Sequence, residues 1–226
     1  MTVDLVVARH NEDTGWLRNI PRGIRSFVYN KGTARERTSE IPLPNHGREA
    51  QSYLFHIVSH YHELPETTIF CQGRPFDHAF DFHDSLARLA REGLADPPGF
   101  EWLGHIIDTD DATGSRLYQR WSKNAERTPL DMADTWSAVF DRPCPETFTF
   151  ACGAQFAVTR STIHRRPHDF YLRAEAASRA RNDAAHAFER MWDAVFDVPG
   201  FPEGLLAGRT TIYRKPIRRL QMDGSP

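Results

Sequence analysis

A nearly continuous apolar run close to the N-terminus, Val3 to His10 (VDLVVARH), is the feature that most restricts how this chain can fold. A strand with one face in water alternates apolar and polar residues, and this valine-rich run does not. It is typical of a strand that is covered on both faces, as in a parallel sheet between helices. A second run of this kind, Thr67 to Gly73 (TTIFCQG), predicts another buried strand.

The segments between and after these runs alternate between strand and helix periodicity. From Glu49 to Tyr61, apolar side chains recur at the spacing of one packed helical stripe. Ile24 to Asn30 predicts a further strand, as does Phe148 to Arg160, whose small central residues allow close approach to the backbone. More helices are expected at residues 84–94, 167–183 and 184–196. This order predicts an α/β fold with a mostly parallel central sheet flanked by helices.

The composition allows one substantial core, since 40% of the 226 residues are hydrophobic and no linker divides the chain. We therefore expect a single domain over residues 1–226. The net charge of -2 disfavours a general nucleic-acid partner, which would normally require a basic excess.

The cysteines and the N-terminus bear on the cellular setting. Cys71, Cys144 and Cys152 show no CxxC spacing, so free thiols in a reduced, cytoplasmic setting are expected. The N-terminus lacks the basic region of a signal peptide. No apolar run approaches the roughly 18 residues that a membrane helix needs, so no membrane insertion is expected. The oligomeric state is left open.

Five segments are distinctive in this order: VVARHNEDTGWL, VYNKG, LPNHGREAQSYLFHIVSHYHELPETTIFCQG, GAQFAVTRSTIHRRPHDFY and FERMWDAVF. On these segments the chain resembles one family of unknown function, domain of unknown function 3431. The resemblance covers most of the chain except about residues 84–147, and the name of the family implies no activity.

Further positions follow a shared order: Asn11 and Glu12 after the first strand, Asn30 and Lys31 after the second, the Asn45–Gly47 turn, Gly153 to Arg160, and Glu189. These positions carry a second, weaker resemblance, to A-type glycosyltransferases of the family-2 kind, which have a Rossmann-like fold. The resemblance implies transfer of a sugar from a nucleotide sugar to a small-molecule or glycan acceptor. It also implies a nucleotide-binding half at about residues 1–83 and an acceptor half at about 84–218, with Gly153 to Arg160 on the acceptor side and Glu189 as base.

The chain departs from that family where an Asp-x-Asp motif would hold a divalent cation, Mn or Mg, against the diphosphate. Its third strand ends instead in Gln72, Gly73 and Arg74. Either no metal is bound, or Asp77 and His78 replace the acids, and Arg74 could neutralise diphosphate directly. The sequence DTDD (Asp108 to Asp111) contains the motif's letters, but we predict a solvated loop there.

The turn NHGRE has two interpretations. In the functional one, backbone amides at the helix start and Arg48 bind a phosphate. In the structural one, Asn45 caps the helix, Gly47 permits the turn, and Glu49 lies favourably in the first turn.

Glu189 could have a raised pKa beside Phe188 and Trp192 and act as a general base, or could pair with Arg190 or Arg181 as an ordinary helix acid. Gly153 and Gln155 are expected on the acceptor side, within the Gly153 to Arg160 segment. Arg165, Arg166 and His168 could bind an anionic acceptor or the leaving diphosphate, or they could form a surface rim.

A metal-dependent hydrolase or oxidative tailoring enzyme remains an alternative, because His56 and His60 share a helix face and His78 follows. A non-catalytic nucleotide- or sugar-binding module is the third hypothesis.

Overall fold

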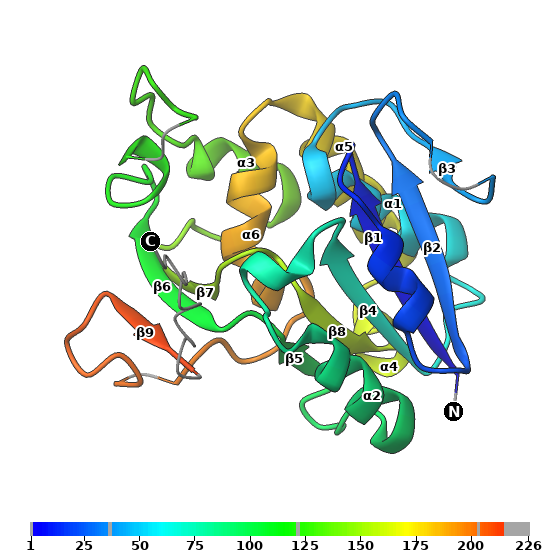
Figure 1. Ribbon diagram of the computed structural model, residues 1–226. Helices are drawn as coiled ribbons and strands as arrows, with labels where there is room; N and C mark the ends of the chain where they lie inside the picture. The colour runs from blue at the N-terminus through cyan, green and yellow to red at the C-terminus, as the bar shows by residue number, and fades with distance from the viewer. Residues whose placement is uncertain (1, 36–37, 121–122, 203, 215–226) are drawn as a thin grey trace, which may run out of the picture.

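The computed structural model describes residues 2–35, 38–120, 123–202 and 204–214. Its centre is a six-stranded sheet in the order β3-β2-β1-β4-β8-β5 (Figure 1). The strands are β1 (Val3–Arg9), β2 (Ile24–Asn30), β3 (Ile41–Pro42), β4 (Thr67–Gln72), β5 (Phe100–Trp102) and β8 (Phe156–Thr159).

Most of this sheet is parallel, as the sequence predicts. β1 pairs in parallel with both β2 and β4, and β2 pairs in parallel with β3. β8 is the exception, because it runs antiparallel to β4 and pairs Thr67 with Thr159. The strand predicted from Phe148 to Arg160 is therefore wrong in one respect: positive φ angles at Gly153 and Ala154 divide it into two strands of different sheets.

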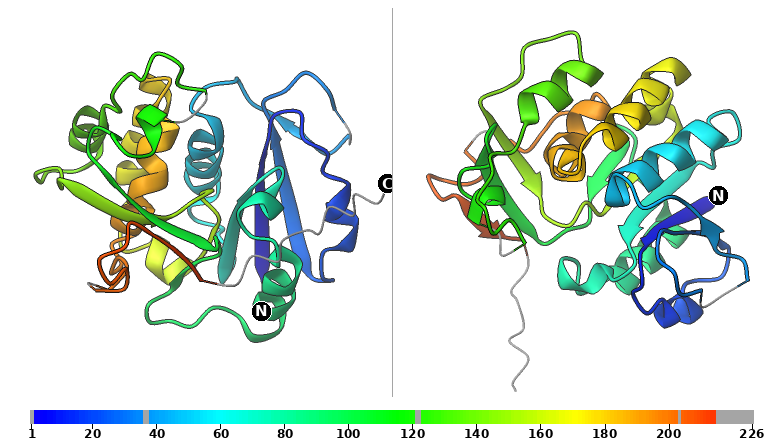
Figure 2. Two further views of the ribbon diagram at one scale, coloured as in Figure 1. Left: turned by 60° about the vertical axis from the view of Figure 1, so that its left-hand side comes forward. Right: turned by 90° about the horizontal axis from the view of Figure 1, so that it is seen from above.

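Helices cover both faces of the sheet, which explains the uninterrupted apolar runs. Val6 and Phe70 point to the face covered by α1 (Arg48–His60), α5 (His168–Ala180) and α6 (Ala184–Val195). Leu5 and Val7 point to the opposite face, which is covered by α2 (Phe82–Glu92) and the 3-10 helix η1 (Gly15–Asn19). Figure 2 shows this division, with α1, α5 and α6 gathered on one side of the strands.

A second, antiparallel sheet lies beside α6 and has the order β7-β6-β9. Its strands are β6 (Ile106–Asp111), β7 (Thr147–Ala151) and β9 (Thr211–Tyr213), and α3 (Met132–Val139) precedes β7 in the chain. The prediction of a solvated loop at DTDD is wrong, because these residues form most of β6 and bury Asp108 and Asp110. Two arginines, Arg116 and Arg190, pair with these carboxylates.

One hydrophobic core joins the two parts of the chain: Val6 and Tyr53 from the first part pack in the same cluster as Trp192 and Phe196 from the last. The described residues contain no helix whose length and hydrophobicity would let it cross a membrane. The end of the predicted acceptor half, after residue 214, lies outside the described residues.

Candidate functional site

The polar residues of the site gather where the order of the parallel strands reverses. From β1 the chain proceeds to β2 and β3 on one side and then returns to place β4 on the other. In open α/β sheets, ligands bind in the crevice outside the carboxyl ends of the strands at such a point. A cavity of about 490 Å³ lies there, and its walls include Arg9 at the end of β1, His10 after it, Lys31 after β2, and Gln72 at the end of β4.

Lysines and arginines outnumber acids in the lining of this cavity, which we call the nucleotide-edge cavity after the expectation from the sequence. Lys31, Arg48, Arg74 and Lys123 contribute to its lining together with the buried Arg9. Burial lowers the pKa of Lys31 to about 8, although the charges of Glu49 and Glu175 act in the opposite direction. A bound anion would relieve the cost of burying this ammonium group.

Asn30 belongs to the support of the cavity and not to its wall. The side chain is buried, and its amide nitrogen donates to Glu40 Oε2 at 2.7 Å and to the Ala34 carbonyl at 2.8 Å. The same Glu40 oxygen lies 3.3 Å from Arg9 Nη1. Asn30 therefore fixes the loop after β2 onto the end of β1.

Two residues that follow β1, Asn11 and Glu12, form hydrogen bonds with the backbone of nearby loops. The Glu12 carboxylate accepts hydrogen bonds from the backbone N–H groups of His10 and Asn11, at 2.6 and 3.2 Å, and it lines the nucleotide-edge cavity. Asn11 is exposed and accepts from the Ala34 N–H at 3.4 Å. Asn45 lines the cavity and lies 3.3 Å from His10 Nε2.

The turn NHGRE combines features of both interpretations. Gly47 occupies the N-cap position of α1 with φ of 58°, and a Cβ there would collide with the Ser178 carbonyl oxygen. The glycine is therefore required by the close approach of α5. Asn45 makes no cap, since the cap position has no side-chain hydrogen bond. Arg48 and Glu49, the next two residues, both line the nucleotide-edge cavity.

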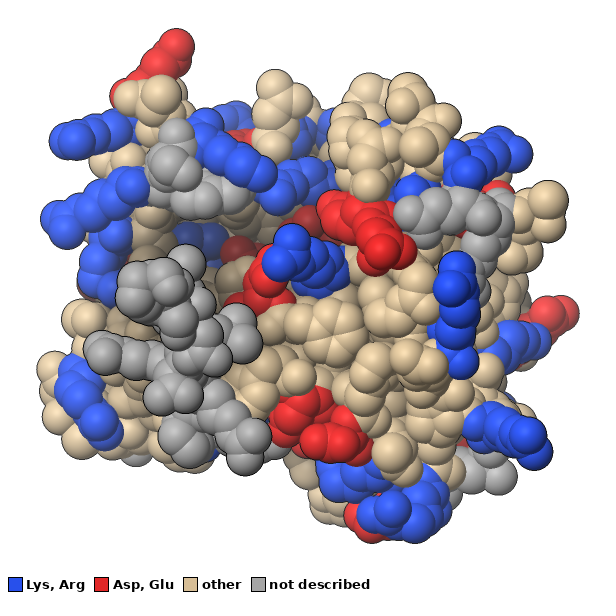
Figure 3. All heavy atoms as spheres, viewed as in Figure 1, with Lys and Arg blue, Asp and Glu red and all other residues tan. Residues whose placement is uncertain are grey.

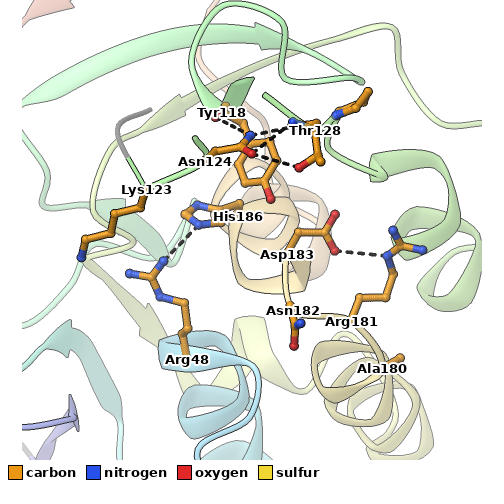
Figure 4. Close-up of a pocket in the computed structure, with 11 residues that line it drawn as sticks. Arg48, Tyr118, Lys123, Asn124, Thr128, Ala180, Arg181, Asn182, Asp183 and His186 are labelled. Carbon is orange, nitrogen blue, oxygen red and sulfur yellow. Dashed lines mark hydrogen bonds and ion pairs between the residues drawn. The ribbon is translucent and has the colours of Figure 1, made fainter. Parts of the chain in front are cut away.

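Arg48 lies at the junction of three neighbouring cavities. Besides the nucleotide-edge cavity, it lines a cavity of about 480 Å³ next to Glu189 and one of about 620 Å³ at the start of α6. Figure 4 shows Arg48 extending from α1 toward His186 of α6, and Arg48 Nη1 lies 3.0 Å from His186 Nε2. Figure 3 shows this side of the molecule hollowed, with acidic and basic groups close together around the hollow.

Glu189 lines the cavity of about 480 Å³, which we call the central cavity. Its side chain is an ionised carboxylate. Its Oε1 accepts the Gly153 N–H at 2.6 Å, and its Oε2 lies 4.0 Å from His186 Nδ1. Burial alone would raise the pKa of Glu189, but His186, Arg190 and the Gly153 N–H together lower it to about 2. The prediction of a raised pKa is therefore wrong, because the hydrogen bond from His186, the charge of Arg190 and a backbone donor outweigh the effect of burial.

This lowered pKa predicts a pH dependence of stability. An acid with a folded-state pKa of about 2 and an ordinary value of 4.5 stabilises the fold above pH 4.5 and loses that contribution as pH falls toward 2. We expect Glu189→Gln to cost on the order of 3 kcal/mol at pH 7 and much less near pH 2. Urea unfolding across this range measures the difference, with the exposed Glu92→Gln as control. A cost that is constant with pH would contradict the shift.

The residues after β4 do not converge on one point. Arg74 and Asp77 lie on the nucleotide-edge cavity with 3.3 Å between Nε and Oδ1, whereas His78 lines the central cavity. Asp77 and His78, the predicted replacements for the missing acids, therefore line different cavities. Among the described residues, no three His, Cys, Asp or Glu side chains form a group suited to a metal. Gln72 lines both cavities from the last position of β4.

The histidines of the alternative metal site are part of the core packing. His56 is fully buried, its Nδ1 lies 2.9 Å from the Tyr29 hydroxyl, and its ring centroid lies 4.6 Å from that of His60. Burial, followed by the charges of His60 and Arg25, lowers the pKa of His56 to about 3. His78 does not join these two, since it lies after the carboxyl end of β4, at the central cavity.

The predicted acceptor residues divide between the two ends of the sheet. Gly153 lines the central cavity with φ of 93°, and a Cβ there would come within 2.6 Å of His78. Gln155 is fully buried and lies beneath the site, 3.5 Å from the Pro75 carbonyl. Arg165 is not at the site. β8 runs antiparallel, so the segment after it lies at the opposite end of the sheet, where Arg165 lies 3.8 Å from Asp96.

The sequence did not predict the site residues that lie between β6 and α3, or His186 on α6. The segment after β6 brings Arg116, Tyr118, Arg120 and Lys123 to the cavities, and α6 adds His186. The spacing of His186 and Glu189, three residues apart on one helix, was the available signal for that pair.

Comparison with curated proteins gives no match for this chain. A family model described as Protein of unknown function (DUF3431) matches residues 5–201. This range includes the strand ends, the turn and the helices that build the three cavities. The chain therefore belongs to the family of unknown function DUF3431.

Proposed function

We propose that this protein is a glycosyltransferase that moves a sugar from a nucleotide sugar to a hydroxyl-bearing acceptor. The observation that carries the proposal is a cation-rich cavity at the point where the strand order reverses, joined through Arg48 to the cavity of Glu189 and His186. The A-type glycosyltransferase fold is part of the proposal. Support for it comes from the strand ends, the Gly47 turn and Glu189, which all face these joined cavities.

The nucleotide-edge cavity suits a diphosphate. Lys31 and Arg74 lie on its wall, and Arg48 lies where it meets the central cavity. Guanidinium groups bind phosphate oxygens through charge-assisted hydrogen bonds. The diphosphate would lie between the carboxyl ends of β1 and β4, and the sugar would extend past Gln72 into the central cavity.

In the transfer step, the acceptor oxygen forms a bond to the anomeric carbon while the bond from that carbon to the diphosphate oxygen breaks. The electron pair leaves with the nucleoside diphosphate, whose charge the cations neutralise. His186 takes the acceptor proton at Nε2, once Arg48 has turned from it to the diphosphate. Glu189, ionised and directed at Nδ1, stabilises the imidazolium that forms.

Thermal unfolding with a panel of ligands tests the proposal. UDP, GDP, dTDP, CMP and their sugars are added with manganese and with EDTA. A ligand at about 100 times its Kd adds roughly 2.7 kcal/mol, which raises the melting temperature by a few degrees. We expect selective stabilisation by one nucleotide. Arg48→Gln should weaken the affinity for that nucleotide about tenfold or more. Arg165→Gln, at the opposite end of the sheet, should leave the affinity unchanged.

Absence of any nucleotide effect would overturn the proposal, as would an equal loss in Arg48→Gln and Arg165→Gln. Stabilisation without turnover, retained in Glu189→Gln, would indicate a non-catalytic binding module. A melting temperature that EDTA lowers and no nucleotide raises would favour the metal-dependent alternative.

A further inference from the structure

The segment that follows β6 is built to hold basic side chains over the central cavity. Asp110 anchors this segment. Its side chain is fully buried and accepts a hydrogen bond from Arg190 Nη2 at 2.7 Å. Asp110 also accepts backbone N–H groups of Arg116, Leu117 and Tyr118, at 3.1 to 3.4 Å. One buried carboxylate thus fixes both the segment and a helix-borne arginine on the same cavity.

Three arginines of this region line the cavity, and they differ in how their charge is balanced. Arg116 pairs with Asp108, and Arg190 pairs with Asp110. Arg120 lines the cavity too, but its exposed side chain makes neither an ion pair nor a hydrogen bond with any other described residue.

The acids that line the central cavity are already engaged. Glu189 accepts the Gly153 N–H and lies near His186, while Glu49 lies 3.8 Å from Arg48. Burial lowers the pKa of Arg116, and the nearby charges of Arg120 and Arg190 contribute in the same direction. Cations grouped in this way repel each other, and a ligand anion among them would relieve the repulsion.

The diphosphate does not require these arginines, because Lys31, Arg48 and Arg74 lie on the nucleotide edge. We propose that the acceptor carries a carboxylate or phosphate group, which Arg120 binds at the rim of the central cavity while its hydroxyl faces His186. Leu117, Tyr118 and Phe150 provide the less polar wall for the body of the acceptor. This inference rests on the proposed transfer reaction and names the acceptor class.

Matched acidic and neutral sugars test it directly by isothermal titration at fixed ionic strength. The pairs are glucuronate with glucuronamide, and glucose 6-phosphate with glucose. We expect at least one acid to bind ten times or more tightly than its neutral partner. Arg120→Gln should remove that preference, and Arg127→Gln should keep it, because Arg127 is exposed on the same segment but lines none of the three cavities.

Equal binding of acid and neutral sugar would overturn the inference, and so would an equal effect of the two arginine substitutions. The preferred acid of the two pairs identifies carboxylate or phosphate as the group bound. The nucleotide panel is read separately: nucleotide stabilisation without acid preference rejects only the acceptor class, whereas acid preference without nucleotide stabilisation rejects the transfer reaction.

Discussion

Asp110→Ala is expected to destabilise the protein by about 3 to 5 kcal/mol, because it leaves the guanidinium of Arg190 buried without its acid. Arg190 is 3% exposed and Asp110 is fully buried in side-chain terms. The substitution also removes the acceptor for the backbone N–H groups that begin the segment after β6. Chemical denaturation measures the loss, and hydrogen exchange should show that this segment opens more often.

Two further variants keep this prediction testable if Asp110→Ala does not fold. Asp110→Asn retains an acceptor but no charge, so it should cost less. The double variant Asp110→Ala/Arg190→Met removes both charges and should recover part of the stability, since no unpaired ion then remains in the core. A double variant less stable than Asp110→Ala would show that Arg190 contributes chiefly by packing on the Phe150 ring, 4.8 Å from it.

The main sheet could be predicted because its central strands are covered on both faces. Val3–Arg9 and Thr67–Gln72 are apolar almost throughout, and the helices between and after them show clear periodicity. The second sheet could not be predicted in this way. β6 contains the buried acids Asp108 and Asp110, which Arg116 and Arg190 reach from elsewhere in the chain. Such tertiary pairing leaves no periodicity in the sequence.

Part of the candidate site could be anticipated for a similar reason. The carboxyl ends of parallel strands lie at the same end of the sheet. Glu12, Lys31 and Gln72 therefore meet at the cavity, as expected. Arg165 shows the limit of that reasoning. Because β8 runs antiparallel to β4, the segment after β8 lies at the opposite end of the sheet. The pKa of Glu189 was misjudged since the sequence shows its aromatic neighbours but not the Gly153 N–H that reaches it across the fold.

His186→Ala is expected to lower the rate of the proposed sugar transfer by about 10² to 10⁴-fold, the usual contribution of a general base. The reason is the position of the imidazole between Arg48 and Glu189, with the central cavity in front of it. A carboxylate whose pKa lies near 2 is a weak base at neutral pH, so the proton is assigned to His186 and not to Glu189. Hydrolysis of the nucleotide sugar that the ligand panel selects provides the assay, with water as acceptor.

Three comparisons separate this role from a structural one. Nucleotide affinity should remain within a few-fold of wild type in His186→Ala, because Arg48 stays available to the diphosphate. Added imidazole should restore part of the rate by occupying the space that the side chain leaves. His62→Ala, which removes an exposed histidine just after α1, should have no effect. If His186→Ala retains the full rate while Glu189→Gln abolishes it, the carboxylate itself accepts the proton, and the lowered pKa of Glu189 must rise when the substrate binds.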